Sequence, residues 1–264
     1  MDSHRLQPWT PLEGPLYAER RETLRPNSEL PPLILLHGFT QTNRSWDPFI
    51  EFLDPHWTII RVDLPGHGLS NHADANLNET AELVASTCGR GFYLGYSMGG
   101  RVALHVALQH PQLTSSLALI GATPGIEDEH EREERRHADE ELADSIERDG
   151  VAKFIKRWLA NPMFDRLPKT GTDIADRNRN TATGLARSLR HVGTGTQRPL
   201  WPQLPTLKMP TAVIAGAEDH KFAAIAQKMT SAIGSNAKLH LVAEAGHTAH
   251  LEQPSAVSAI INAL

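Results

Sequence analysis

Three residues whose side chains can cooperate in proton transfer or nucleophilic attack follow apolar runs of the sequence: Ser97, Asp219 and His247. A serine hydroxyl barely ionises at neutral pH, so it needs a base such as His247 to take its proton. The imidazole in turn needs a carboxylate, such as Asp219, to hold one ring nitrogen and stabilise the positive charge. In an open parallel sheet, ligands bind beyond the carboxyl ends of the strands. The sequence therefore predicts that the three residues form one catalytic site.

Ser97 lies in residues 95–99, which read G-x-S-x-G. Residues 91–94 before it are apolar and strand-like, and residues 101–108 after it are rich in helix formers. A strand, a tight turn and a helix are the setting of a nucleophile elbow, in which a strained turn exposes the serine hydroxyl. The glycines on either side suit a turn that leaves no room for side chains. The alternative is an ordinary strand–helix turn.

The other two residues have alternative roles. Asp219 can cap the helix expected at 221–233, a role compatible with catalysis, and Glu218 competes with it as the carboxylate. His247 can be an ordinary loop histidine. His247 and His250 are three residues apart, but no carboxylate or cysteine completes a ligand set, so we expect no metal site.

Apolar runs and helical patterns alternate along most of the chain. Strands are predicted at 33–36, 57–62, 91–94, 117–120, 211–216 and 238–242, and helices at 79–88, 101–110, 221–233 and 254–264. The weakly patterned Leu6–Leu24 is compatible with an opening hairpin. Continuous apolar runs are typical of strands buried on both faces. The alternation predicts an α/β fold with βαβ units and a mostly parallel sheet flanked by helices.

The pattern changes after Pro124, where residues 127–148 are dense in charge. Helices are predicted there and at 151–159 and 173–190, and no run between them resembles a core strand. We therefore expect an α/β core formed by 1–125 and 199–264, with 126–198 inserted as a helical lid.

Composition narrows the functional classes. The chain has 264 residues and a formal net charge of −5, which argues against nucleic acid as a partner. One cysteine, Cys88, allows no internal disulfide and favours the reducing cytoplasm. Met1–Asn27 does not resemble a signal peptide, and no apolar run approaches the roughly 18 residues of a membrane span. We expect a cytoplasmic, monomeric enzyme with no membrane partner.

Further motifs carry a family resemblance. They are His37-Gly38-Phe39 with Trp46, Gly100-Arg101 after the elbow, Pro124-Gly125, residues 184–190, Gly193-Thr194-Gly195-x-Gln197, Leu200-Trp201, Asp219-x-Lys221-Phe222, and Gly246-His247-x-x-His250-Leu251-Glu252. With the order Ser…Asp…His, the chain resembles the α/β-hydrolase superfamily. Within it, the chain is similar to the family of 2-succinyl-6-hydroxy-2,4-cyclohexadiene-1-carboxylate synthases of menaquinone biosynthesis. The resemblance implies the α/β-hydrolase fold with a helical lid, and no cofactor.

The resemblance also implies a reaction. The substrate is a cyclohexene carboxylate with succinyl and enolpyruvyl groups, and loss of a proton beside the succinyl ketone leads to elimination of pyruvate. Ser97 is then the general base, supported by His247 and Asp219, and no acyl-enzyme forms. An oxyanion hole needs two backbone amides, which we expect from Met98, directly after the serine, and from Phe39 in the loop after the first core strand.

The implied small-molecule substrate carries three carboxylates, which arginine side chains can bind through two hydrogen bonds. The family positions correspond to Arg101 beside the elbow and to two lid residues, Arg135 and Arg177. In this crowded region Arg132 and Arg136 compete with Arg135, and Arg179 competes with Arg177.

Two aromatic residues, Tyr96 and Trp158, correspond to positions that line the family's pocket, although Trp158 is also explained by packing within the lid. Two other functional classes remain open. One is a carboxylesterase or C–C bond hydrolase with the same triad, and the other is a binding protein on a hydrolase scaffold. Arg101 favours the synthase, because an esterase for neutral substrates gains nothing from a buried cation.

Overall fold

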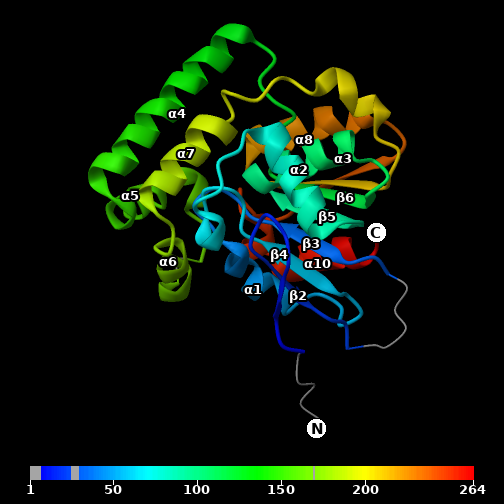
Figure 1. The fold of residues 1–264 in the computed structure, drawn as a ribbon. Coiled ribbons are helices and arrows are strands. Elements are labelled where there is room, and N and C mark those ends of the chain that lie inside the picture. The colour runs from blue at the N-terminus through cyan, green and yellow to red at the C-terminus, as the bar shows by residue number, and fades with distance from the viewer. Residues whose placement is uncertain (1–6, 25–29, 169) are drawn as a thin grey trace.

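The computed structural model describes residues 7–24, 30–168 and 170–264. Within these ranges eight strands form one sheet in the order β1-β2-β4-β3-β5-β6-β7-β8 (Figure 1). The strands are β1 (Thr10–Leu12), β2 (Ala18–Arg21), β3 (Leu33–Leu36), β4 (Ile59–Val62), β5 (Gly91–Tyr96), β6 (Thr114–Ile120), β7 (Thr211–Gly216) and β8 (Ala237–Val242). β1 and β2 form the expected hairpin, although Leu6 lies outside the described residues. β2 is antiparallel to β4, and every later pairing is parallel.

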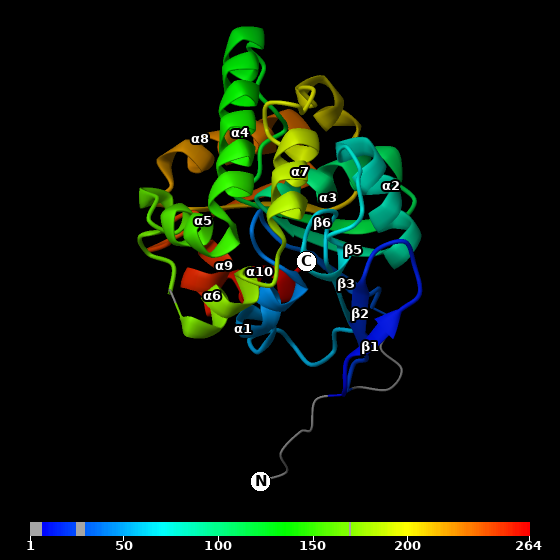
Figure 2. The ribbon, with the colours of Figure 1, turned by 60° about the vertical axis from the view of Figure 1, so that its left-hand side comes forward.

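Helices cover both faces of the sheet, as the alternating pattern predicts. On one face lie α2 (Leu77–Cys88), α3 (Met98–Gln109) and α8 (His220–Ile233), and on the other lie α1 (Asp47–Ile50), α9 (Ala249–Glu252) and α10 (Pro254–Asn262) (Figure 2). Each face has its own apolar core. β3, β5 and β7 are buried along their whole length, which explains their uninterrupted apolar sequences.

Among the described residues, four α-helices lie between β6 and β7 in the sequence and are found beside one end of the sheet (Figure 1). These insertion helices are α4 (Glu129–Asp149), α5 (Val151–Trp158), α6 (Gly171–Arg177) and α7 (Ala182–Val192). Side chains such as Ile146, Phe154 and Leu185 form an apolar core between α4, α5 and α7. Arg190 of α7 forms ion pairs with three acids of α4, which explains part of the charge run.

The prediction of one helix over 173–190 is wrong, because the chain breaks between α6 and α7. Asn180 lies in the break, and its buried amide donates to the carbonyls of Thr40 and Arg177. Thr181 then caps α7 by accepting from the Gly184 amide. The bond from Asn180 to Thr40 therefore connects the insertion to the loop after β3.

Shorter 3-10 helices complete the described chain: η1 (Asn43–Trp46), η2 (Gly68–Ser70), η3 (Pro162–Phe164) and η4 (Trp201–Thr206). None of the helices in the described ranges is long and apolar enough to cross a membrane.

Candidate active site

Ser97 occupies a strained turn between β5 and α3. Its φ of 51° is in the left-handed region, which a residue with a side chain adopts only when its surroundings require it. A Cβ atom on Gly95 would lie 2.2 Å from the Gly99 carbonyl oxygen, and one on Gly99 would lie 2.0 Å from that of Leu36. The two glycines therefore allow the close packing that exposes the serine hydroxyl.

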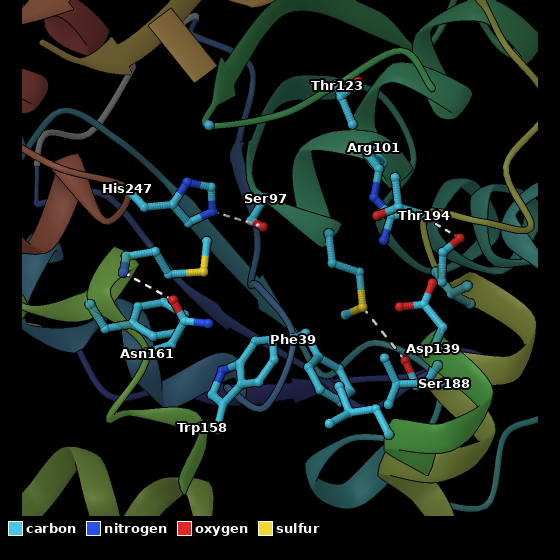
Figure 3. Close-up of a pocket in the computed structure, with 18 of the residues that line it drawn as sticks. Phe39, Ser97, Arg101, Thr123, Asp139, Trp158, Asn161, Ser188, Thr194 and His247 are labelled. Carbon is cyan, nitrogen blue, oxygen red and sulfur yellow. Dashed lines mark hydrogen bonds between the residues drawn. The ribbon is translucent and has the colours of Figure 1, made fainter. Parts of the chain in front are cut away.

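A chain of hydrogen bonds connects the three residues predicted to act together (Figure 3). His247 Nε2 lies 3.2 Å from Ser97 Oγ, and His247 Nδ1 lies 2.7 Å from Asp219 Oδ2. The His247 side chain is only 2% exposed. With Nδ1 donating to the carboxylate, Nε2 is free to accept a proton from the serine hydroxyl. The arrangement can therefore activate Ser97 as a base or as a nucleophile.

Asp219 is the carboxylate that contacts His247, and it also caps α8. Its Oδ1 accepts from the Phe222 amide at 3.2 Å, so both roles considered for it coexist. Burial alone would raise the pKa of the Asp219 carboxyl, but the hydrogen bond and charge of His247 and the Phe222 amide outweigh burial and lower that pKa. Glu218, the competing residue, is exposed and forms an ion pair with Arg166.

The loop that carries His247 is held by Glu252, a residue that the sequence analysis names only within a family motif and gives no role. The Glu252 carboxylate accepts from the Gly246 amide at 2.5 Å, the Thr248 amide at 2.9 Å and the Thr248 hydroxyl at 2.5 Å. It therefore fixes the residues on both sides of His247. No pattern in the sequence distinguishes this acid from one on the surface of a short helix.

The amides of Phe39 and Met98 are available for a developing negative charge. Both residues line the same cavity as Ser97, and within the described residues neither amide donates a hydrogen bond. The loop of Phe39 is held by two buried histidines. His37 Nε2 accepts from the Leu64 amide at 3.1 Å, and His67 Nε2 accepts from the Thr40 amide at 3.3 Å. Both predicted donors therefore lie beside the cavity of Ser97, and their role as an oxyanion hole stays a prediction.

We expect the buried histidines to make the fold acid-sensitive. Burial lowers the pKa of His67 and of His250, which packs between Tyr96 and Trp46, to about 3. In the unfolded chain these histidines titrate near pH 6.5, so below that pH the unfolded chain binds more protons than the folded chain. The free energy of unfolding therefore decreases as the pH is lowered from about 7.5 to about 5.5. Between about pH 7.5 and 5.5, each histidine lowers the free energy of unfolding by about 1.4 kcal/mol, and the two together lower it by about 2.7 kcal/mol.

Urea unfolding at those two pH values measures this loss. Substitution of an exposed histidine, His137→Gln, serves as the control and is expected to leave the pH dependence unchanged. A free energy of unfolding that is constant or rises on acidification would contradict neutral burial of His67 and His250.

The cavity beside Ser97 has a volume of about 860 Å³ and lies between the sheet and the insertion helices. Phe39, Phe154, Trp158 and Phe164 form its aromatic wall, with ring centroids 5.4 Å apart for Phe39 and Trp158. Tyr96 also lines it and packs against His247 at 5.4 Å. Tyr96 and Trp158 therefore both line the cavity, and their contact with a substrate stays a prediction.

Arg101 lies in the same cavity without an acidic partner. Its side chain reaches only neutral oxygens, those of Gly193 at 3.5 Å and Gln197 at 3.4 Å, and no carboxylate of the described chain pairs with it. It is 7% exposed, and burial, together with the nearby charge of Arg135, lowers its pKa to about 10. An arginine buried in this way is suited to a ligand that supplies the missing negative charge.

Arg135 and Arg177 also line the cavity, whereas their competitors do not. Arg135 Nε donates to Asp139 at 2.8 Å, and Arg177 Nε donates to Asp173 at 2.9 Å. The competitors are held elsewhere: Arg132 by backbone carbonyls, Arg136 by Glu133, and Arg179 by Asp176.

A search against protein families finds the alpha/beta hydrolase family over residues 33–260. The chain belongs to the alpha/beta hydrolase family. The 2-succinyl-6-hydroxy-2,4-cyclohexadiene-1-carboxylate synthase of Enterobacter sp. (strain 638) is 34% identical over 239 residues, covering 88% of this chain and 90% of the relative. The synthase of that name from Serratia proteamaculans (strain 568) is also 34% identical, and the match covers 88% of this chain and 92% of the relative. Among solved structures, that of MenH from S. aureus matches with a TM-score of 0.83 and 31% sequence identity, and the match covers 92% of this chain and 96% of that chain.

This alpha/beta hydrolase has further cavity residues that the sequence analysis missed. They include Lys221 and four residues labelled in Figure 3, Thr123, Asn161, Ser188 and Thr194. The sequence analysis names Ser188, Thr194 and Lys221 only within family motifs and gives none of the five a role. These residues come from five separate segments, and only the folded chain brings them together.

Proposed function

We propose that this chain is a 2-succinyl-6-hydroxy-2,4-cyclohexadiene-1-carboxylate synthase. In that reaction pyruvate is eliminated from 2-succinyl-5-enolpyruvyl-6-hydroxy-3-cyclohexene-1-carboxylate. The observation that carries the proposal is Arg101, a buried guanidinium that forms no ion pair with any acid of the described residues, in the same cavity as Ser97. A tricarboxylate supplies the missing charge, whereas a neutral ester leaves it buried and unpaired. The names of relatives that match most of the chain support the same activity.

In this reaction Ser97 acts as the general base. It takes the proton from the ring carbon beside the succinyl ketone while its own proton passes to His247, 3.2 Å away. The ring double bond shifts, the C–O bond to the enolpyruvyl group breaks, and the released pyruvate enolate takes up the proton held on His247 to become pyruvate. Asp219 stabilises the imidazolium that forms. Every atom of the substrate is accounted for in the two products, so water and an acyl-enzyme are not required.

The developing enolate oxygen is stabilised by the amides of Phe39 and Met98. Such donors act only as charge appears on the oxygen, so they lower the barrier rather than tighten ground-state binding. Arg101, Arg135 and Arg177 bind the carboxylates, with Tyr96 and Trp158 as the walls that orient the ring. Since Arg135 and Arg177 already have acidic partners, Arg101 contributes most to binding.

An esterase is the second candidate, because the same hydrogen-bonded chain can activate Ser97 for attack on a carbonyl. Pyruvate release, coupled to lactate dehydrogenase, and hydrolysis of a neutral aryl ester separate the two activities. We expect rapid pyruvate release from the succinyl-enolpyruvyl substrate and a far lower kcat/KM for the ester. The reverse order would favour the esterase.

A further inference from the structure

The charges around the cavity are unevenly balanced. Five cationic side chains line it: Arg101, Arg135, Arg157, Arg177 and Lys221. Three of these form ion pairs within the protein, Arg135 with Asp139, Arg157 with Asp149 and Arg177 with Asp173, at 2.8–2.9 Å. Their charges are therefore largely compensated before any ligand enters.

The other two cations, Arg101 and Lys221, have no carboxylate within ion-pair distance in the described parts of the chain. They differ in setting, because Arg101 is buried and Lys221 is exposed. They also come from different sides of Ser97. Lys221 follows Asp219, the partner of His247, by two residues, whereas Figure 3 shows Arg101 on the opposite side of Ser97 from His247.

We propose that Lys221 forms a second carboxylate subsite at the His247 side of the cavity. A ligand with two carboxylates then lies across Ser97, with one carboxylate on the Arg101 guanidinium and the other on the Lys221 ammonium. A lysine on a flexible stem suits this exposed position, since it binds a carboxylate as a point charge without fixing its angle. Asn161 lines the same side of the cavity, and its amide nitrogen has no partner among the described residues. It can donate to the same carboxylate.

The identity of the ligand in this inference rests on the proposed function. The charge balance of the cavity does not depend on that function. Lys221 has one competing role, which is to help keep Asp219 ionised, because its charge contributes to the lowered pKa of that carboxyl. A carboxylate subsite and an effect on Asp219 predict different kinetic changes. Loss of the subsite raises KM, whereas loss of the effect on Asp219 moves the acid limb of the pH profile.

The test is the variant Lys221→Met in pyruvate release from the succinyl-enolpyruvyl substrate. Lys228→Met is the matched control, since Lys228 is exposed on the same helix and pairs with Glu127 outside the cavity. We expect Lys221→Met to raise KM about fivefold, the scale of an exposed ion pair, with kcat at the pH optimum unchanged. Lys221→Arg should restore KM. An unchanged KM, an equal change in Lys228→Met, or a change confined to the acid limb of the pH profile would overturn the proposal.

Binding of succinate, followed by titration calorimetry, tests the subsite without catalysis. We expect Lys221→Met to weaken succinate binding about fivefold and Lys228→Met to leave it unchanged. If the wild type releases no pyruvate but succinate binding shows this pattern, the proposed function fails and the subsite stands. If pyruvate is released but Lys221→Met binds succinate like the wild type, or the wild type does not bind it, the subsite proposal fails.

Discussion

Replacing Ser97 with alanine is expected to reduce kcat for pyruvate release by about 10²–10⁴-fold, the usual contribution of a positioned general base. The serine hydroxyl is the group that His247 can deprotonate, at 3.2 Å, and it lies in the same cavity as the two free amides. KM should change little, because the carboxylates are bound by cations elsewhere in the cavity. Coupled lactate dehydrogenase kinetics, corrected for spontaneous elimination, measure both constants.

A second substitution tests whether this loss depends on the hydrogen bonds that connect Ser97, His247 and Asp219. His247→Ala should cause a loss of similar size, and the double variant should be no worse than either single one, because residues that act as a unit are not additive. Circular dichroism and Tm check that each variant folds. A Ser97→Ala enzyme that keeps most of its kcat would mean that another group abstracts the proton.

Replacing Arg101 with methionine is expected to lower kcat/KM for the tricarboxylate on the order of 10²-fold or more, since truncating one partner of a buried charge pair costs about 2–5 kcal/mol. Hydrolysis of a neutral aryl ester should be affected far less. Arg101→Lys should give an intermediate loss, because lysine keeps the charge but not the two-pronged geometry. Equal losses for both substrates would contradict a carboxylate-binding role.

The same substitution should stabilise the free protein. Arg101 is 7% exposed, and the oxygens it contacts are neutral, at 3.4–3.5 Å, so the folded state bears much of the cost of removing its charge from water. Methionine removes that cost, and we expect Tm of Arg101→Met to exceed that of the wild type. Loss of activity with a gain in stability is the pattern of a residue kept for ligand binding. A lowered Tm would indicate that Arg101 holds the fold together.

The local features of the fold could be predicted because they depend on short stretches of sequence. Uninterrupted apolar runs identified β3, β5 and β7, and the glycines around Ser97 identified the elbow. Parallel strands place their carboxyl ends at one edge, so the proximity of Ser97, Asp219 and His247 followed from the strand assignments. Their hydrogen bonds agree with that prediction, while their catalytic roles remain proposals.

Features that depend on distant contacts could not be predicted. The break between α6 and α7 depends on bonds from Asn180 to a loop some 140 residues earlier. The partners of Arg135 and Arg177 stand four residues away on helices rich in both charges, where many pairings are equally compatible with the sequence. For the same reason, the sequence could not show that Arg101 and Lys221 are the cavity cations that form no ion pair within the described part of the chain.

The most direct test of the central claim is pyruvate release by the wild-type protein from 2-succinyl-5-enolpyruvyl-6-hydroxy-3-cyclohexene-1-carboxylate, measured beside the spontaneous reaction. We expect release in proportion to enzyme concentration, with kcat in the range of about 1–10³ s⁻¹ that is typical of enzymes. Release no faster than the spontaneous rate, from a folded protein with an intact Ser97, would contradict the account.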